Sequence, residues 1–541
     1  MKLLNFLKNE STIPFHRVAF MSIVTGLSNS LLLAIINHAA NFIAKREITT
    51  QYFFMYFIVL ALFLYAQWFS MSEAISLIEE AVANLRIRLS NKLRHVDLSF
   101  YERKSVNILY NRLTGDNSAL SNAIPQITVA VQFSTLVFFS LIYMAFISPI
   151  SFFIAVFGIL CGYFYFLTLS KKIKESTVDI INYETEYFGS LSSLLNGFKE
   201  IKINQTKSES LYKTLTNNAI KARDIKILLG KMQVRTMGAG RIVICTIIPI
   251  LIFIVPMYSH EQTVNIFKIT ATMLFIYGPV TILFDVVPLV SEVNALLDYI
   301  YGLEKEIDAA IHQGKRHPEV SYAEFKELNI NNLAFSYPKQ KKSDAFSIGP
   351  ISEKISAGEL IFIIGGNGSG KSTFLKLLVG LYYPTEGDIT VDQTLIDDDS
   401  YQDYRELFSI IFTDFYLFDQ LYGIEGIEEE KVNYWLKKMQ MDTITSFKEG
   451  RFTNTDLSTG QRKRLAFIAA ILEDKPILIL DEFAADQDPV FRKYFYEDIL
   501  KELKAIGKTV IAVTHDDHYF HIPDRVLKMD SGNLIKFSID K

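Results

Sequence analysis

The chain has 541 residues, of which 21% are charged and 13% aromatic, and its 55 basic and 59 acidic side chains give a net charge of −4. A nearly neutral chain that is 50% hydrophobic and has two cysteines excludes a nucleic-acid-binding polyelectrolyte, a disordered chain and a disulfide scaffold. The mean hydropathy of +0.20 over this length indicates a portion embedded in a membrane.

The first 300 residues contain long stretches without charge. About 20 residues cross a hydrocarbon core of ~30 Å as a helix, so the longest uncharged stretch, from Asp116 to Lys171, has room for two spans. The sequence therefore predicts six membrane-spanning helices, near residues 18–41, 52–76, 127–148, 150–170, 242–259 and 269–291.

Lysine and arginine gather between the second and third spans and again between the fourth and fifth. Basic segments remain on the cytosolic side, so we expect both termini and both long segments in the cytosol, with the segments continuing as helices beyond the bilayer. Binding to anionic lipid headgroups is a compatible alternative. The apolar part of Met1–Lys8 is too short for a cleavable signal, so the first span is expected to direct its own insertion.

From about residue 325 the pattern changes to short apolar strands that alternate with helical stretches. Leu360–Ile364, 477–480 and 510–513 are predicted as buried parallel strands. The expected organisation is a transmembrane domain over residues 1–300, a linker over 301–325 and a cytosolic α/β domain over 326–541.

A glycine-rich loop follows the first of these strands. It reads Gly365-Gly366-Asn367-Gly368-Ser369-Gly370-Lys371-Ser372, with Thr373 next in a helical pattern, and it matches the phosphate-binding loop of ATPases. Its glycines let backbone N–H groups converge on phosphates, Lys371 adds a cation, and Ser372 offers a hydroxyl to Mg²⁺. ATP and Mg²⁺ are therefore the predicted cofactors. The alternative, a glycine turn formed by chance, is disfavoured by the flanking strand and helix.

The strand at residues 477–480 ends in two carboxylates. Asp481 is predicted to face the metal, and Glu482 is predicted to orient and polarise the attacking water. The alternative is a solvated acidic turn.

A third string lies between the glycine-rich loop and the acidic strand: Leu457-Ser458-Thr459-Gly460-Gln461. Together the three motifs resemble those of ATP-binding cassette (ABC) proteins, although Thr459 stands where glycine is usual. The resemblance implies two cassettes arranged head to tail, in which Ser458 and Gly460 face the γ-phosphate held by the other chain. A second copy of the chain is therefore an expected partner.

Four further residues match ABC positions one by one. Tyr337 resembles the aromatic that stacks on adenine, with a core tyrosine as the alternative. Asp488 resembles the acidic residue of the loop that joins the cassettes, and His515 resembles the histidine that contacts the γ-phosphate. Thr413 stands where a glutamine is usual; its hydroxyl is expected to reach Mg²⁺ or water, and Asp414 would substitute less directly.

The strings around Gly349-Pro350, Thr413-Asp414 and Asp488-Pro489 narrow the resemblance to the bacterial cyclic-peptide exporters, which include microcin and siderophore-peptide exporters. This implies a homodimer in the cytoplasmic (inner) membrane, with the cassette in the cytosol, that exports a cyclic or modified peptide. Two alternatives remain: a lipid or glycolipid flippase, and a membrane-tethered regulatory ATPase without cargo. Membrane lipid is an expected partner and nucleic acid is not.

The membrane half resembles the exporter type of half-transporter, in which turns at the ends of cytosolic helix extensions dock on the cassettes. We place these turns near residues 107–116 and 219–230, with undocked surface helices as the alternative. Asp285, an ionisable residue within the sixth span, is a functional candidate unless it lies at the cytosolic interface. The aromatic residues of the second and fourth spans are expected to face lipid or the interface rather than a cargo cavity.

Overall fold

The computed structural model describes residues 2–44, 50–103, 106–258, 260–311, 325–337, 346–424 and 426–537. The chain divides into two compact units, Met1–Val96 with Phe100–Ile311 and Asp97–Ser99 with His312–Lys541. The first unit is helical, and the second combines helices and strands. Of the linker predicted over 301–325, residues 312–324 lie outside the described part, and helix α9 (His260–Asp308) occupies its beginning.

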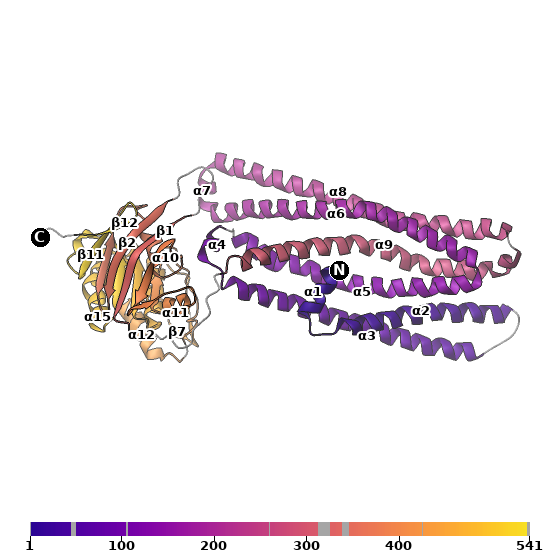
Figure 1. Ribbon diagram of the computed structural model, residues 1–541, viewed down its shortest axis with the longest axis horizontal. Helices are drawn as coiled ribbons and strands as arrows, with labels where there is room; N and C mark the ends of the chain where they lie inside the picture. The colour runs from indigo at the N-terminus through magenta and orange to yellow at the C-terminus, as the bar shows by residue number, and fades with distance from the viewer. Residues whose placement is uncertain are drawn as a thin grey trace. The chain divides into compact units, whose positions relative to one another are not determined.

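The described part of the first unit is dominated by six long helices (Figure 1): α2 (Phe15–Ala44), α3 (Thr50–Leu93), α5 (Val106–Ile147), α6 (Pro149–Asn196), α8 (Gln205–Pro249) and α9. The predicted spans fall within these helices in chain order; the fifth continues past α8 through a π-helical segment, Ile250–Ile254, and a 3₁₀ turn, Val255–Tyr258. Pro256 has no N–H to donate, which accounts for a break in regular α-helical bonding there. Among the described residues, five helices are long and apolar enough to cross a membrane, and α6 adds the shorter apolar segment Pro149–Tyr165.

Small residues let three of these helices approach closely. Phe284 of α9 occupies the space beside Gly162 of α6 and Gly240 of α8, where an added Cβ would lie 2.6 Å from its ring in either case. Close approach through glycine is typical of helix packing in membranes. The neighbouring Asp285 is half-buried, and its Oδ1 has no hydrogen-bond partner among the described residues.

The two turns predicted for the helix extensions are wrong. Residues 107–116 lie within α5 and residues 219–230 within α8, and both helices are continuous there. Between α6 and α8 the chain instead passes through a short helix, α7 (Phe198–Ile203). Gly197 follows the end of α6, and the Asn204 side chain accepts a hydrogen bond of 3.0 Å from the Lys207 N–H to cap α8. Gly230 lies inside α8, and a glycine alone does not end a helix.

The amino terminus adds a short amphipathic helix, α1 (Lys2–Glu10), to the first unit. Its buried residues include Leu3, Phe6 and Leu7. At its end, the buried carboxylate of Glu10 forms an ion pair with Arg88 of α3. The helix therefore packs its apolar side against the bundle, and the ion pair holds its last residue to α3.

The second unit contains two main sheets. A six-stranded sheet has the order β12–β11–β3–β10–β9–β6, with bounds β3 (Leu360–Ile364), β6 (Phe408–Ile411), β9 (Ile477–Asp481), β10 (Thr509–Val513), β11 (Arg525–Asp530) and β12 (Asn533–Lys536). All neighbours in it are parallel except β11 and β12. An antiparallel sheet has the order β2–β1–β4–β5, with bounds β1 (Glu327–Ser336), β2 (Ser347–Ser356), β4 (Glu386–Val391) and β5 (Thr394–Leu395). A small third sheet pairs β7 (Phe447–Lys448) with β8 (Arg451–Phe452).

The central strands are buried on both faces, as their unbroken apolar sequences predict. Every residue of β3, β9 and β10 is buried. Side chains alternate between two cores: Phe362 joins a core with α12 (Glu429–Lys438) and α13 (Thr459–Leu472), whereas Ile361 and Ile363 join a core with α10 (Lys371–Leu378) and the antiparallel sheet. The three predicted parallel strands are thus confirmed, and helices cover both faces of their sheet (Figure 1).

Candidate active site

The predicted site residues gather at the carboxyl edge of the parallel sheet. The glycine-rich loop follows β3, the pair Asp481–Glu482 closes β9, and His515 follows β10. Parallel pairing sets Val513 beside Asp481, and Ile411 beside Leu480, so Thr413 also emerges at this edge. Ligand sites in open α/β sheets form at this edge.

The glycine-rich loop forms a cradle open on one side. Gly365, Gly368 and Gly370 have φ of +151°, +76° and +108°, which glycine adopts without strain. A Cβ at Gly365 would lie 2.3 Å from the Met529 carbonyl oxygen. Lys371 is 7% exposed, and its Nζ donates to the carbonyls of Gly365 at 2.9 Å and Gly366 at 3.1 Å. The loop therefore holds its cation in place.

Beside the loop lies a cavity of about 490 Å³. It is lined by Phe346, Asn367, Gly368, Gly370, Lys371, Ser372, Thr373 and Glu482. The buried hydroxyl of Ser369 has no hydrogen-bond partner among the described residues. Loop amides at a helix N-terminus, one lysine and an unused hydroxyl suit a polyphosphate.

Three oxygen groups meet where Mg²⁺ is predicted. The Oδ2 of Asp481 accepts hydrogen bonds from Ser372 Oγ at 3.2 Å and Thr413 Oγ1 at 3.0 Å. Burial raises the pKa of Asp481, and the bonds from Thr413 and Ser372 oppose that rise. Among the described residues no group of three or more His, Cys, Asp or Glu side chains is placed to hold a metal. Hydroxyl and carboxylate oxygens fit Mg²⁺, which commonly uses one or two protein carboxylates together with phosphate oxygens and water.

Glu482 lines the cavity, and His515 lies beside Glu482. The His515 Nε2 is 3.3 Å from the Glu482 Oε1. Glu482 has left-handed backbone angles, φ 50° and ψ 39°, which are uncommon for a residue with a side chain. The Glu482 N–H donates to the Val513 carbonyl at 3.2 Å, so the Glu482 backbone is held against the end of β10. A carboxylate beside an imidazole at a phosphate cradle is an arrangement suited to activating water.

Two aromatic residues near the loop, Tyr337 and Phe346, have different surroundings. The Tyr337 hydroxyl bonds Thr373 Oγ1 at 3.2 Å and Tyr382 at 3.3 Å, and its ring packs edge-on against Phe335 and Tyr382. Phe346, which the sequence analysis missed, lines the cavity and is 40% exposed. It lies beside Tyr337 because the Tyr337 N–H donates to the Phe346 carbonyl at 3.1 Å. The two rings are therefore competing candidates for stacking on a base.

The signature residues begin α13. Ser458 is its N-cap, and the Ser458 hydroxyl and Gln461 side chain form a capping box with the opposite backbone N–H groups, at 3.4 and 3.1 Å. Ser458 and Thr459 are exposed. None of the residues 457–461, all in the described part of the chain, lines the cavity beside the glycine-rich loop.

Asp488 caps a helix. It precedes α14 (Pro489–Tyr494), and its Oδ1 accepts a bond of 2.9 Å from the Phe491 N–H. The Arg464 Nη2 donates to its Oδ2 at 2.8 Å. The backbone bond from Phe491 is the main cause of a lowered pKa at Asp488. Its predicted place in a dimer loop remains a prediction.

Two family models match the chain, one described as "ABC transporter transmembrane region" over residues 16–280 and one as "ABC transporter" over residues 348–485. The chain is similar to the ATP-binding protein SyrD of Pseudomonas syringae pv. syringae, at 29% identity over 539 residues, or 96% of this chain and 94% of that protein. It is also similar to the ATP-dependent lipid A-core flippase of Wigglesworthia glossinidia brevipalpis, at 24% identity over 85% of this chain and 80% of that protein.

A solved structure, that of a bacterial Atm1-family ABC exporter with ATP bound, shares the fold. Its TM-score is 0.76 at 17% identity, with 96% of this chain and 94% of that chain covered. The transmembrane-region model matches the six-helix unit, and the ABC transporter model matches the unit that contains the sheets. The chain belongs to the ABC exporter half-transporters, whose ATPase domain couples ATP hydrolysis to transport.

Proposed function

We propose that two copies of this chain form an exporter that moves a cyclic or otherwise modified peptide across the bacterial inner membrane. The observation that carries the dimer is the position of the signature turn. Ser458 and Thr459 are exposed at the start of α13, a helix end that suits an anion, yet they do not line the cavity of their own glycine-rich loop. A second copy would bring this turn to the open side of that cavity.

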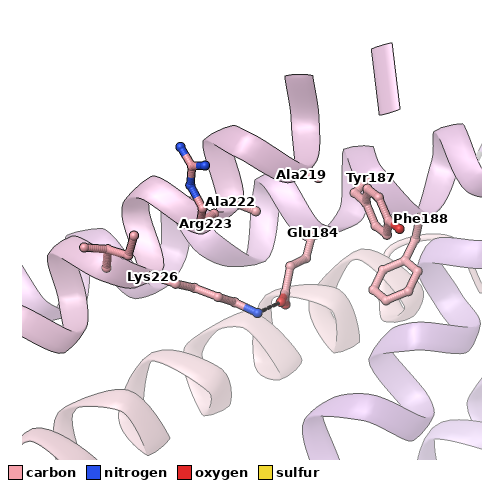
Figure 2. Close-up of a pocket in the computed structure, with 8 residues that line it drawn as sticks. Glu184, Tyr187, Phe188, Ala219, Ala222, Arg223 and Lys226 are labelled. Carbon is pink, nitrogen blue, oxygen red and sulfur yellow. Dashed lines mark ion pairs between the residues drawn. The ribbon is translucent and has the colours of Figure 1, made fainter. Parts of the chain in front are cut away.

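The helix extensions support a second copy as well. A cleft of about 530 Å³ lies between α6 and α8. Figure 2 shows the ion pair of Glu184 and Lys226 there, with the rings of Tyr187 and Phe188 nearby. Phe188 is 42% exposed. Other large apolar side chains of the same segment are more than half exposed: Leu195, Phe198, Ile203 and Tyr212. Apolar surface on a basic extension outside lipid is expected to be covered by protein.

Each residue at the sheet edge then has a task in ATP hydrolysis. The loop amides and Lys371 bind the phosphates, while Ser372, Asp481 and Thr413 would hold Mg²⁺, which would offset phosphate charge. Glu482 polarises the attacking water, and His515 contacts the γ-phosphate. The base stacks on Tyr337 or Phe346. Because ATP bridges two cassettes, it favours the closed dimer, and hydrolysis lets the dimer reopen.

The peptide cargo is supported by the resemblance of the strings around Pro350, Thr413 and Pro489 to cyclic-peptide exporters. A lipid cargo is the second candidate, because several relatives are named lipid A-core flippases. The chain spans 80% or less of those two proteins, against 94% of SyrD. A regulatory ATPase without cargo is the third candidate, and the six long helices argue against it, because a membrane anchor alone does not require them.

The deciding experiment uses proteoliposomes with the cassettes outside. We expect ATP-dependent uptake of a labelled cyclic or siderophore peptide, and no ATP-dependent movement of a labelled lipid A. A Glu482→Gln preparation provides the matched control without hydrolysis. Lipid movement without peptide uptake would support the flippase, and ATP hydrolysis that moves neither would support the regulator.

A further inference from the structure

Lys463 is a buried cation in the cassette. It lies in the second turn of α13, four residues after the exposed Thr459, and is 2% exposed. Its Nζ donates to the main-chain carbonyl of Glu482 at 2.8 Å and forms an ion pair with Asp486 Oδ2 at 2.7 Å. A lysine is rarely buried unless it is paired, so these two contacts account for its position.

The carbonyl that Lys463 binds belongs to a residue in an uncommon conformation. Left-handed backbone angles are strained for a residue with a side chain, so neighbouring groups must hold Glu482 there. The other bond to this carbonyl, from the Ala485 N–H, is long at 3.4 Å. The bond from Lys463 is therefore the closer and charge-assisted restraint on the orientation of the Glu482 peptide.

Other residues in the first turns of α13 also contact the loop 482–488. The Gln487 side chain donates to the Gly460 carbonyl at 3.0 Å and accepts from Arg464 Nε at 2.8 Å. A Cβ on Gly460 would lie 2.7 Å from the Asp486 carbonyl oxygen, so helix and loop are in close contact. The base of α13 and the loop 482–488 thus form one connected unit.

We propose that Lys463 is a positioning residue, which acts through the Glu482 carbonyl to keep the Glu482 carboxylate turned toward the cavity of its own chain. The inference rests on the catalytic role proposed for Glu482. It adds that the helix beginning with the signature, which would contact nucleotide in the partner, also sets the hydrolytic carboxylate of its own chain.

The first test separates positioning from folding in the full-length protein. Lys463→Met keeps the apolar stem and removes the donor, and we expect kcat for ATP to fall about tenfold or more while the dissociation constant for ATP, measured without hydrolysis, stays within about twofold. Lys463→Arg should recover part of kcat. Asp486→Asn, which leaves the bond to the carbonyl intact, should remain within about threefold of wild type.

Lys437→Met is the matched control, because Lys437 is an exposed lysine on α12. Unchanged kcat in Lys463→Met, or parallel loss of kcat and ATP binding in both Lys463→Met and Lys463→Arg, would overturn the inference. If Glu482→Gln itself hydrolysed ATP at the wild-type rate, the proposed role of Glu482 would fail instead.

The second test uses mixed dimers purified through two different tags. With Lys463→Met and Glu482→Gln in the same chain, the other chain keeps an intact catalytic carboxylate and its anchor. With the two changes in different chains, both carboxylates are impaired. We expect faster hydrolysis from the first arrangement. Equal rates, or faster hydrolysis from the second, would show that Lys463 does not act on the glutamate of its own chain.

Discussion

Thr413 donates a hydrogen bond of 3.0 Å to the same carboxylate oxygen of Asp481 that accepts from Ser372. The hydroxyls of Thr413, in the loop after β6, and Ser372, in the first turn of α10, therefore converge on one carboxylate oxygen. The sequence placed Thr413 where related cassettes carry glutamine, and the contact shows how the shorter side chain still reaches the carboxylate.

Thr413→Val should raise the Mg²⁺ concentration needed for half-maximal ATPase activity, because the valine keeps the shape and loses the hydroxyl. We expect a shift of roughly fivefold, in line with about 1 kcal/mol for one lost hydrogen bond. Thr413→Ser is the matched control and should behave as wild type. Thr413→Gln should also be tolerated. An unshifted Mg²⁺ dependence in the valine variant, or near-complete loss of activity in the glutamine variant, would contradict this account.

Asp481→Asn should stabilise the protein when nucleotide is absent. Burial raises the pKa of Asp481, so as pH falls the folded cassette takes up a proton before the unfolded chain does. The ionised carboxylate therefore costs folding free energy above the raised pKa, and stability decreases as pH rises from the ordinary carboxyl range through that value. We expect Tm at pH 7 to rise by roughly 2–4 °C, for about 1 kcal/mol.

The same comparison made near pH 4 should show a smaller gain, because both the folded and unfolded wild-type carboxyls are then increasingly protonated. Addition of Mg²⁺ and ATP should raise the Tm of wild type more than that of Asp481→Asn. A lower Tm for the asparagine variant at pH 7 without nucleotide would contradict the assignment. Differential scanning fluorimetry of the detergent-solubilised chain provides these values.

Lys371→Ala should abolish ATP turnover, because Lys371 is the only cation among the described residues that line the cavity beside the glycine-rich loop. Glu482→Gln should preserve ATP binding and slow hydrolysis by a factor on the order of 100 or more, since it removes the carboxylate that polarises water. Binding of a fluorescent nucleotide and release of phosphate separate the two effects. Normal turnover by either variant would refute the corresponding role.

Phe346→Ala should weaken ATP binding, because Phe346 presents an exposed ring to the cavity. Stacking of a base on an aromatic ring contributes ~1–3 kcal/mol, so a loss of about tenfold in affinity is expected. Tyr337→Phe removes only the hydroxyl that bonds Thr373 and Tyr382 and should have a small effect. If Tyr337→Ala weakened binding and Phe346→Ala did not, Tyr337 would be the stacking residue, as the sequence resemblance implied.

Local patterns in the sequence were enough to predict the spans, the three buried strands and the glycine-rich loop. Each depends on residues adjacent in the chain: uncharged stretches of membrane length, runs such as Leu360–Ile364, and glycines followed by Lys371. The turn between α6 and α8 also has local signals, Gly197 and the cap Asn204, whereas residues 219–230, where the turn was predicted, continue α8.

The contacts between distant segments could not be predicted in this way. Lys463 reaches Glu482 because α13 packs beside the loop after β9. Phe346, the residue before β2, reaches the cavity because its ring lies against Gly370. Such contacts depend on the packing of helices and strands, which no single stretch of sequence specifies. Lys463 appears in the sequence as one of three consecutive basic residues, Arg462, Lys463 and Arg464, only one of which is buried.

The central claim is that each ATP site combines the glycine-rich loop of one chain with the signature turn of another. Its most direct test mixes a Lys371→Ala chain with a Ser458→Arg chain, each inactive as a homodimer, and measures ATP hydrolysis by the mixed dimer. The account predicts that hydrolysis returns, because one complete site forms from the intact loop of the second chain and the intact signature of the first. A mixed dimer as inactive as its parents, or a Ser458→Arg homodimer with full activity, would contradict it.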